Sequence, residues 1–307
     1  MKKSRLAIAA LVITSIVWGI TIIVLKLVLK EVPPFSLAFL RFSLASLMIS
    51  PIFIFDGVHH PLHLKDTPKL FLLGLVGVTI HLSLIFFGVK NTTATNAAII
   101  TALTPLGVAT AASSFLKETN SPNYYSGSLI ALLGILAIFG AEPLFNSANF
   151  SPIHHLGNLL ILGSVLTWSI FNIGSKELFK KYNSFTITAF LFLTGMVTFA
   201  PLAFLEYQAN PTWTSHVSDQ SILGIIFLAL FSSVVAYLLY EWGLEHVRTS
   251  TAGLINYLTP VVTIISAVFI LGETITLPFL LGSILIMCGL TLAIRPSSNH
   301  IHHSHKV

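Results

Sequence analysis

The sequence predicts an all-α membrane protein with ten transmembrane helices, arranged as two inverted-topology repeats of five helices each. Hydrophobic residues make up 54% of the 307 residues and charged residues only 9%, whereas a soluble globular domain carries about 25% charged residues. Ten segments are apolar over about 20 residues, the length that a helix needs to cross a bilayer. A long apolar stretch in the first half of the chain also recurs without a gap 155 residues later. Lipid is therefore the predicted solvent for most of the chain.

The predicted helices are joined by short polar links, which leave no room for an appended soluble domain. The first helix follows a basic N-terminus without a small-residue cleavage site, so we expect it to be retained rather than removed as a signal peptide. Residues 1–148 are predicted to form the first repeat, residues 149–295 the second, and residues 296–307 a disordered polar tail. The ten predicted spans are residues 6–26, 35–55, 69–89, 94–116, 126–144, 156–175, 185–206, 220–242, 250–271 and 276–294.

Lysine and arginine residues outside the predicted spans indicate the orientation of the chain. If the N-terminus is cytoplasmic, 12 of these residues face the cytoplasm and only three, Lys26, Lys30 and Lys90, face the other side. Membrane proteins carry an excess of lysine and arginine in their cytoplasmic loops. Both termini are therefore predicted to be cytoplasmic, and the formal charge of +5 is assigned to a membrane face rather than to nucleic-acid binding.

The recurring stretch pairs Asn96–Glu118, in the fourth predicted helix, with Thr251–Glu273 in the ninth. An odd number of helices separates equivalent positions, so the second copy would enter the membrane from the opposite side. Inverted repeats of this kind are typical of alternating-access transporters, which bind substrate between two similar bundles. The matched pairs include Pro105 with Pro260, Glu118 with Glu273, Gly88 with Gly243 and, at an offset of 150, Trp18 with Trp168 and Lys26 with Lys176.

These motifs resemble those of the EamA-type family of the drug/metabolite transporter superfamily, over nearly the whole chain from Leu6 to Arg295. Each half has a tryptophan in its first helix, a proline within its fourth, an apolar run that closes on glutamate, and glycines in its fifth. The resemblance implies a ten-helix carrier of the bacterial inner membrane, without a cofactor, that exports amino acids or other small metabolites. Residues similar to the pattern of the amino-acid exporter subgroup are Tyr237, Tyr240, Gly243, Tyr257 and Pro260.

Polar and aromatic residues within the spans are the candidates for binding substrate, because a polar group in hydrocarbon is costly unless it faces protein or water. Amides can hold the polar ends of a zwitterion, and aromatic faces can hold its side chain or ammonium group. The alternative role for tryptophan and tyrosine is to anchor helices at the membrane interface. The expected substrate-binding residues are Trp18, His81, Asn96, Trp168, Asn172, Tyr237, Asn256 and Tyr257.

Glu241 and His81 are the candidates for coupling transport to protons. A partly desolvated carboxyl group and an imidazole can each gain and lose a proton near neutral pH. Two alternatives remain open: Glu241 could be a solvated residue at a helix end that pairs with Arg248, and His81 could form an interhelical hydrogen bond to serine or threonine. Arg41, in the Arg-Phe pair that matches the family, is expected to reach lipid headgroups or a helix C-terminus and is not assigned to substrate.

Four matched residues are predicted to have mechanical or structural roles. A proline inside a helix removes a backbone donor and permits a kink, so one in each copy suggests paired hinges. The two glutamates close their helices and can accept hydrogen bonds from the N-termini of neighbouring helices. Glycines of the fifth helices, among them Gly134 and Gly282, are expected to allow close packing. The hinge and structural residues are Pro105, Pro260, Glu118 and Glu273.

The function predicted from these features is a secondary transporter whose partners are a small-molecule substrate, the lipid bilayer and, as a candidate coupling ion, the proton. The sequence has no Walker A loop, and no metal site or nucleic-acid partner is expected. A proton-coupled multidrug or cation efflux carrier is the main alternative. An intramembrane enzyme is a distant alternative, because no H-E-x-x-H motif and no aspartate lies in the spans. A monomer and a homodimer both remain open.

Overall fold

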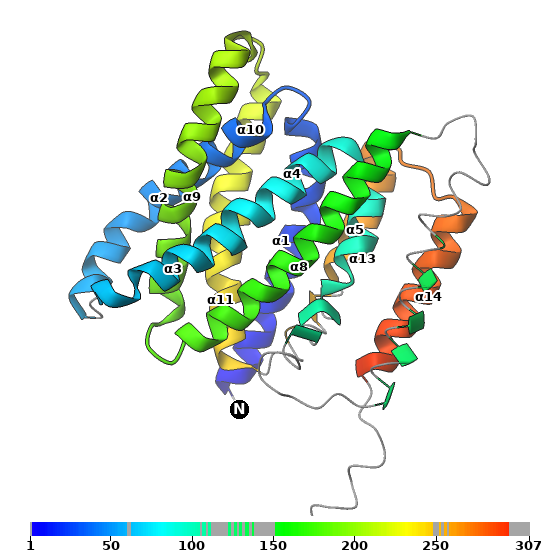
Figure 1. The fold of residues 1–307 in the computed structure, drawn as a ribbon, viewed down its shortest axis with the longest axis horizontal. Helices are drawn as coiled ribbons and strands as arrows, with labels where there is room; N and C mark the ends of the chain where they lie inside the picture. Colours follow the sequence, from blue (N-terminus) through cyan, green and yellow to red (C-terminus); the bar gives the residue numbers. More distant parts are fainter. Residues whose placement is uncertain are drawn as a thin grey trace, which may run out of the picture.

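Every regular element in the described part of the chain is a helix, and the helices pack into one bundle (Figure 1). Three predicted site residues, Pro105, Glu118 and Tyr257, lie outside the described residues, as does Arg248. The computed structural model describes residues 2–59, 63–104, 106–108, 110–111, 122–123, 126–127, 129–130, 133–134, 137, 151–247, 252, 255–256 and 258–294.

The first half of the chain, residues 1–148, contributes two long helices and a third crossing built from consecutive helical segments. Within that crossing a π-helical segment, η2, separates α3 from α4. The elements are α1 (Lys2–Val28), α2 (Pro34–His59), η1 (Leu64–Asp66), α3 (Thr67–Gly74), η2 (Leu75–Ile80), α4 (His81–Asn91) and α5 (Ala94–Thr101).

The second half, residues 149–295, follows the same order of long and interrupted helices. Its interrupted crossing contains the π-helical segment η5 between α10 and α11. The elements are α8 (Pro152–Leu178), α9 (Ser184–Ala209), η4 (Pro211–Ser215), α10 (Asp219–Phe227), η5 (Leu228–Val235), α11 (Ala236–His246), α13 (Leu258–Ser266), η6 (Ala267–Leu271) and α14 (Leu277–Ile294).

The described helices have the length and surface of membrane-spanning segments. Six of them are long and apolar enough to cross a bilayer, and three shorter apolar helices begin at Ala94, Leu258 and Leu280. Large apolar side chains cover their outside, as in Phe269, which is 84% exposed, and Leu47, which is 68% exposed. Because water would not favour such a surface, the chain is a multi-pass membrane protein. Most of the predicted span 126–144 lies outside the described residues.

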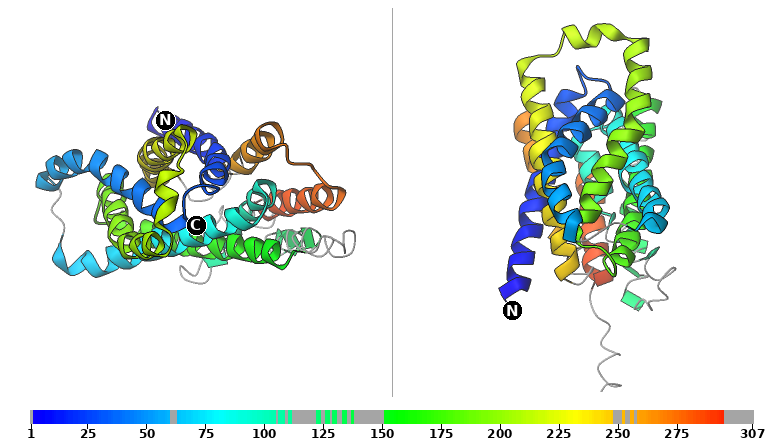
Figure 2. Two further views of the ribbon diagram at one scale, coloured as in Figure 1. Left: turned by 90° about the horizontal axis from the view of Figure 1, so that it is seen from above. Right: turned by 90° about the vertical axis from the view of Figure 1, so that its left-hand side faces the viewer.

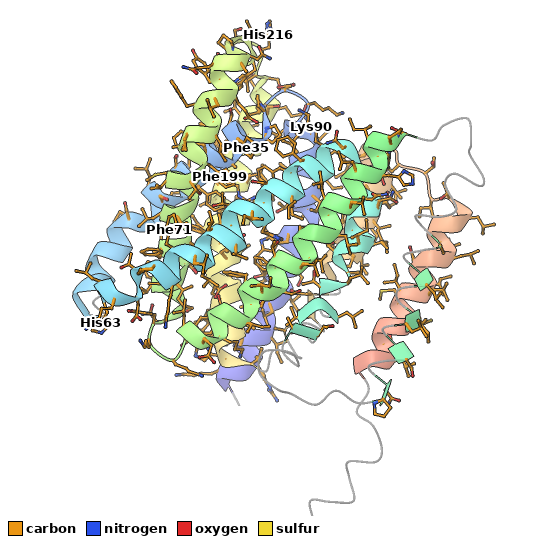
Figure 3. The ribbon with its side chains drawn as sticks, viewed as in Figure 1. Phe35, His63, Phe71, Lys90, Phe199 and His216 are labelled. Atoms are coloured by element: carbon orange, nitrogen blue, oxygen red, sulfur yellow. The ribbon has the colours of Figure 1, made fainter. Side chains whose placement is uncertain are left out.

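The two ends of the bundle are named here after two residues labelled in Figure 3, Lys90 and His63, which lie at opposite ends. The N-terminal end of α1 lies at the His63 end (Figures 1 and 3). Viewed from above, α14 lies at one edge of the bundle, and α2 and α3 reach the opposite edge (Figure 2).

The first helix of each half packs antiparallel to the interrupted crossing of the other half. Thr14 Oγ1 donates to the Ala236 carbonyl at 3.3 Å and Trp18 Nε1 donates to the Ser232 carbonyl at 3.2 Å, so residue numbers rise along α1 as they fall along α11 and η5. In the other half, α8 crosses η2 and α4 in the same manner, as the glycine contacts below show. These two antiparallel pairs bring both halves together around the centre of the bundle.

Gly88 and Gly243, which match in the repeat, allow these two pairs to approach closely. A Cβ atom on Gly88 would lie 2.5 Å from Ile161 Cδ1, and one on Gly243 would lie 2.6 Å from Leu11 Cγ. Leu11 and Ile161 differ by 150 residues, the offset that relates α1 to α8. Each glycine therefore meets an equivalent side chain of the other half. A small residue is needed at both positions because any side chain would push the helices apart.

Two lysines make a second pair of equivalent contacts, at opposite ends of the bundle. Lys26 Nζ donates to the carbonyl of Thr92, the residue that ends α4. Lys176 Nζ donates to the carbonyl of Val247, the residue that ends α11, at 3.4 Å. Thr92 and Val247 differ by 155 residues, and the lysines by 150. Both ammonium groups neutralise the partial negative charge of a helix C-terminus.

The π-helical segments η2 and η5 also correspond, because an offset of 155 carries residues 75–80 onto residues 230–235, within η5. Such segments are rare and are frequent at functional sites. In this bundle each of them lies in the middle of a crossing, close to the centre of the molecule.

Candidate functional site

A cavity of about 140 Å³ lies at the centre of the bundle, between the two halves. At roughly 15 Å³ for each water molecule in the same measure, it has room for about ten waters or for one small metabolite. Four pairs of its lining residues match in the repeat: Trp18 with Trp168, Leu82 with Tyr237, Thr101 with Asn256, and Thr104 with Thr259. The other lining residues are Thr21, Ile22, Leu25, Arg41, His81, Ile85, Phe86, Ala102, Ser164, Val165, Ser232 and Pro260.

Four aromatic rings, from Trp18, Trp168, Tyr237 and Tyr240, form what we call the aromatic cluster. The indoles of Trp18 and Trp168 meet edge to face, with ring centroids 5.6 Å apart at 84°. Tyr237 packs on Trp18 at 5.5 Å, and Tyr240 on the same ring at 4.9 Å. On α1 the cavity is lined by Trp18 and by residues that follow it toward the Lys90 end. The aromatic cluster therefore closes the cavity on the side of the His63 end.

Three members of the aromatic cluster, Trp168, Tyr237 and Tyr240, are buried inside the bundle. The alternative that they anchor helices at the membrane interface is therefore wrong. Edge-to-face contacts between rings are favourable because the positive edge of one ring meets the negative face of another. The cluster is thus a packed aromatic partition, of which Trp18, Trp168 and Tyr237 line the cavity.

His81 lies in the first turn of α4 and lines the cavity. Its Nδ1 is 3.0 Å from the Ser164 carbonyl oxygen, which can only accept, so Nδ1 carries a proton and donates. The Thr167 hydroxyl lies 3.3 Å from the same nitrogen, and the ring packs on Trp168 at a centroid distance of 4.9 Å. The interhelical hydrogen bond that was an alternative in the sequence analysis is present. It fixes the orientation of the ring, and Nε2 takes no part in it.

Arg41 is a cavity residue that the sequence analysis did not assign to substrate. The expectation that it reaches lipid headgroups or a helix C-terminus is wrong, because the side chain is only 2% exposed and lines the cavity. Its Nε donates to Ser233 Oγ at 2.6 Å, and its Nη2 donates to the hydroxyl and carbonyl of Ser232 at 3.0 and 3.3 Å. The pair of serines in the apolar run of η5 is the sequence signal that could have indicated its partner.

The predicted asparagines occupy three different places. Asn256 lines the cavity and its Oδ1 accepts from the Ser15 hydroxyl at 3.4 Å. Asn172 is buried next to the aromatic cluster, where its Oδ1 accepts from the Tyr240 hydroxyl at 2.7 Å. Asn96 lies in the first turn of α5, with its backbone N–H donating to Thr93 Oγ1, and it is not among the cavity-lining residues.

Glu241 lies on α11 beyond the aromatic cluster, toward the His63 end. The alternative of a solvated carboxylate at the helix end is wrong, because Glu241 is 0% exposed. Neither carboxyl oxygen forms a hydrogen bond within the described part of the chain. The Ser175 hydroxyl on α8 is likewise buried without a hydrogen-bond partner there. An ionised carboxylate is costly in such a place, so the group is suited to binding a proton.

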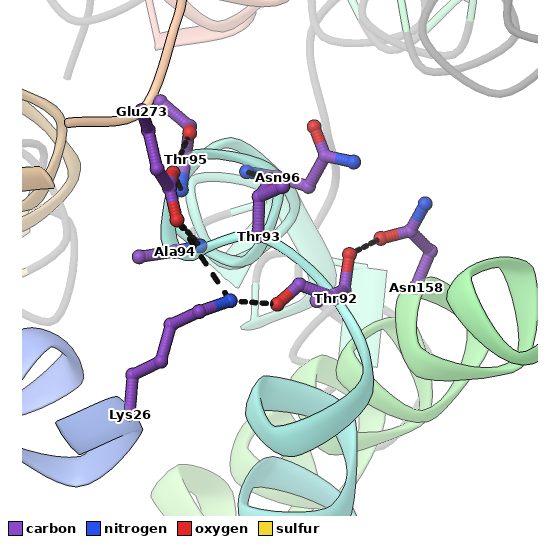
Figure 4. Close-up of polar contacts among 8 residues, drawn as sticks. All are labelled: Lys26, Thr92, Thr93, Ala94, Thr95, Asn96, Asn158 and Glu273. Carbon is purple, nitrogen blue, oxygen red and sulfur yellow. Dashed lines mark hydrogen bonds and ion pairs between the residues drawn. The ribbon is translucent and has the colours of Figure 1, made fainter. Parts of the chain in front are cut away.

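Glu273 binds the N-terminus of α5 at the Lys90 end (Figure 4). Its Oε1 accepts from the Ala94 backbone N–H at 2.8 Å, and its Oε2 accepts from the backbone N–H of Thr95 at 3.0 Å and from the Thr95 hydroxyl. Lys26 Nζ lies 3.8 Å from Oε1. A carboxylate is favourable here because it satisfies free N–H groups and meets the positive end of the helix dipole.

Two further carboxylates make the same kind of contact at this end. Glu206, at the end of α9, accepts from the backbone N–H groups of Phe35 and Ser36 at 3.1 and 2.8 Å, in the first turn of α2. Glu31 accepts from the N–H of Ser218, which precedes α10, at 2.9 Å. All three carboxylates therefore join one half of the chain to a helix N-terminus of the other half. We call these contacts the Lys90-end contacts.

The backbone N–H of Ser218, and then the hydroxyls of Ser221 and Ser218, hold the pKa of Glu31 below its ordinary value. A carboxyl group stabilised in its ionised form keeps its contact until the pH falls through this lowered pKa. The contact of Glu31 is therefore present throughout the neutral range and is lost only in acid.

At the His63 end, the equivalent contact has its charges reversed. Lys181 Nζ lies 3.1 Å from both oxygens of Asp66, and the Tyr182 hydroxyl donates to Oδ2 at 2.9 Å. Lys181 matches Glu31 at an offset of 150, and Asp66 precedes α3 as Ser218 precedes α10. Each end of the bundle thus has a contact between the halves at the same place in the repeat.

Small residues of the fifth helices meet where the two halves adjoin. A Cβ atom on Gly134 would lie 2.6 Å from the carbonyl oxygen of Gly282 in α14. Because the obstacle is backbone, position 134 has no room for a side chain while the helices stay at this distance. Pro260, the described member of the predicted proline hinges, is buried in α13 and lines the cavity.

Both halves of the chain match the sequence pattern of one protein family. The sequence model of the EamA-like transporter family matches the chain twice, over residues 5–140 and over residues 155–295. The chain belongs to the EamA-like transporter family. Its members are transporters, and the double match places one copy of the family pattern in each half of the chain.

Proteins with similar sequences match this chain over nearly its full length. An uncharacterized transporter of Archaeoglobus fulgidus is 28% identical, covering 92% of this chain and 95% of its own length. The uncharacterized transporter YetK of Bacillus subtilis is 27% identical, covering 96% of this chain and 88% of its own. A protein of known crystal structure matches with a TM-score of 0.65 and 18% identity over 94% of this chain and 96% of its own, which shows a shared fold.

Proposed function

We propose that this protein is a secondary transporter of the bacterial inner membrane that exports small polar metabolites, amino acids or their derivatives, by alternating access. In this proposal the chain forms ten helices in two five-helix halves of inverted topology, with both termini in the cytoplasm. The observation that carries the proposal is the central cavity, which lies between the halves and is lined by residues that match in the repeat.

Equivalent contacts in the two halves support the inverted arrangement. Gly88 and Gly243 meet equivalent side chains, Lys26 and Lys176 bind equivalent helix ends, and both interrupted crossings contain a π-helical segment. Two similar units that face opposite directions can exchange conformations, and this exchange opens the site between them to one compartment and then to the other.

The contacts between the halves at the two ends support a gate at each. Opening toward the Lys90 end would separate Glu31, Glu206 and Glu273 from the helix N-termini that they bind. Opening toward the His63 end would separate Asp66 from Lys181 and Tyr182. We expect Pro260, together with Pro105, to act as a hinge beside the cavity, because proline removes a backbone hydrogen bond from the helix.

Protons are the proposed coupling ion. Glu241 is a buried carboxyl group without a hydrogen-bond partner among the described residues, and His81 lines the cavity. While Glu241 is shielded from water, its protonated form is favoured. Exposing Glu241 to water on the His63 side would let it release the proton. Substrate and proton would then bind on opposite sides of the aromatic cluster.

Flux through the purified protein tests the proposed function. In proteoliposomes loaded with labelled L-amino acids and simple derivatives, we expect efflux above that of protein-free liposomes for at least one compound. A matched control is the double variant Glu31→Cys/Ser218→Cys in a Cys288→Ser background, treated with a short bifunctional thiol reagent. This cross-link should stop efflux, whereas the untreated variant should keep it. Efflux equal to that of empty liposomes across the whole panel would count against the proposal.

A further inference from the structure

The charge of the central cavity is unbalanced. Its lining residues include one side chain that is always charged, Arg41, and no aspartate or glutamate. His81 is the other basic lining residue, and a second positive charge beside the guanidinium would be unfavourable. The described side chains around the cavity therefore present one positive charge and no negative charge to whatever binds there.

Arg41 has no carboxylate to neutralise it among the described residues. The ion pairs found there are those of Lys26, Lys180 and Lys181. Asp56, on the same helix α2, lies 15 residues further on, which is about 22 Å along a helix. Buried charges are normally paired, so a buried guanidinium with no carboxylate among the described residues is suited to binding an anion that enters the cavity.

The hydrogen bonds of Arg41 leave its Nη1 group for such an anion. Its hydrogen bonds to Ser232 and Ser233 use Nε and Nη2, and within the described part of the chain Nη1 makes none. Hydrogen bonds from a guanidinium to a carboxylate are strengthened by the charges, and the two serines hold the side chain in one orientation with Nη1 left to donate. The residue that matches Arg41 in the second half is Leu191, which is buried and apolar, so the repeat does not require a cation here.

We infer that Arg41 is the anion-binding residue of the cavity and that the transported substrate carries a carboxylate. One cation matches one negative charge, which favours a monoanionic carboxylate over a phosphate dianion. His81 Nε2 accepts hydrogen bonds in the neutral ring, because Nδ1 donates to Ser164, so it can receive an N–H of the same substrate. This inference rests on the proposed transport function, and it excludes organic cations as the principal substrates.

Matched compounds test the inference on the unaltered protein. Each set contains an amino acid, its amide and the corresponding amine without the carboxyl group, for example L-phenylalanine, L-phenylalaninamide and phenethylamine, or L-leucine, L-leucinamide and isoamylamine. Tetraphenylphosphonium serves as the cation. Binding is measured by thermal stabilisation of the purified full-length protein, and transport by efflux from proteoliposomes. We expect carboxylates to bind and move, and their amides, amines and the cation to do so at least tenfold less well.

Substitution of Arg41 provides the second arm. Arg41→Gln should raise the half-saturating concentration of a transported carboxylate by about 10- to 100-fold, the effect of losing a hydrogen bond to a charged group. Arg41→Lys, which keeps the charge but not the fork of donors, should fall between Arg41→Gln and the unaltered protein. Lys90→Gln, which removes an exposed cation outside the cavity, should leave the half-saturating concentration unchanged.

The outcomes separate the inference from the proposed function. Carboxylates that bind in preference to their amides and lose affinity in Arg41→Gln support the inference. Amides, amines or tetraphenylphosphonium that bind as well as carboxylates overturn it while leaving the transport function intact, as does an Arg41→Gln variant with unchanged affinity. No binding and no efflux of any compound by the unaltered protein would overturn the proposed function together with the inference.

Discussion

Replacing Gly77 by alanine is expected to lower the free energy of unfolding by about 1–3 kcal/mol, the usual effect of overpacking a core. The new Cβ would lie 2.1 Å from Cδ2 of Phe171, a ring that is fully buried and has no free space to move into. Phe171 also stacks on Trp168 with centroids 4.8 Å apart. A displaced Phe171 would therefore shift the aromatic cluster, so efflux should fall together with the thermal unfolding temperature in detergent.

Gly163→Ala is the matched control for this substitution. A Cβ on Gly163, in α8, would meet Leu84 Cδ1 at 3.4 Å, an ordinary van der Waals distance. Alanine is favoured over glycine inside a helix by about 1 kcal/mol, so this variant should be as stable as the unaltered protein or slightly more stable. Equal unfolding temperatures for Gly77→Ala and Gly163→Ala would show that η2 and α8 are not packed as described.

Glu241→Gln is expected to abolish the dependence of efflux on an imposed proton gradient. The carboxyl group is buried without a hydrogen-bond partner among the described residues, and in the proposed mechanism its proton is taken up and released as the conformation changes. Glutamine keeps the size of the side chain but has no proton to release. Because Glu241→Gln also removes a buried ionisable group, the variant should unfold at the same temperature as the unaltered protein or at a higher one. Efflux is measured with and without a pH difference across the membrane.

Glu245→Gln provides the control on the same helix. Glu245 lies one turn beyond Glu241 and is exposed, so its substitution should change neither the proton dependence nor the stability. Efflux from Glu241→Gln that still responds fully to the proton gradient would clear Glu241 of a coupling role. Loss of the response in both variants would point to the charge of this helix end rather than to Glu241.

Much of the fold could be predicted from the sequence because helix length and hydropathy are set by the bilayer. The predicted span 156–175 lies within α8, and the predicted span 185–206 lies within α9. The correspondence of Gly88 with Gly243 was visible as a constant offset, and both glycines occupy tight helix contacts. Residues that must be small or must end a helix leave such a signature, because the backbone around them tolerates few alternatives.

The direction of individual side chains could not be predicted in the same way. Arg41 lies within a predicted apolar helix, but hydropathy does not say which face of the helix it occupies. Its serine partners are about 190 residues away in the sequence. Asn96 lies in an apolar stretch, yet it falls in the first turn of α5 because Thr93 caps that helix. Glu241 precedes the end of its helix by one turn, and its burial follows from the packing of α11 against other helices, chiefly α1 and α9.

The most direct measurement of the inverted arrangement is the sidedness of two exposed loop residues, His63 and His216, which lie at opposite ends of the bundle (Figure 3). Each is changed separately, as His63→Cys and His216→Cys, in a Cys288→Ser background, because Cys288 is exposed. Vesicles of both orientations are then treated with a membrane-impermeant maleimide. Inverted halves predict that position 63 reacts only from the cytoplasmic side and position 216 only from the opposite side. Labelling of both positions from one and the same side would contradict two halves that cross the membrane in opposite directions.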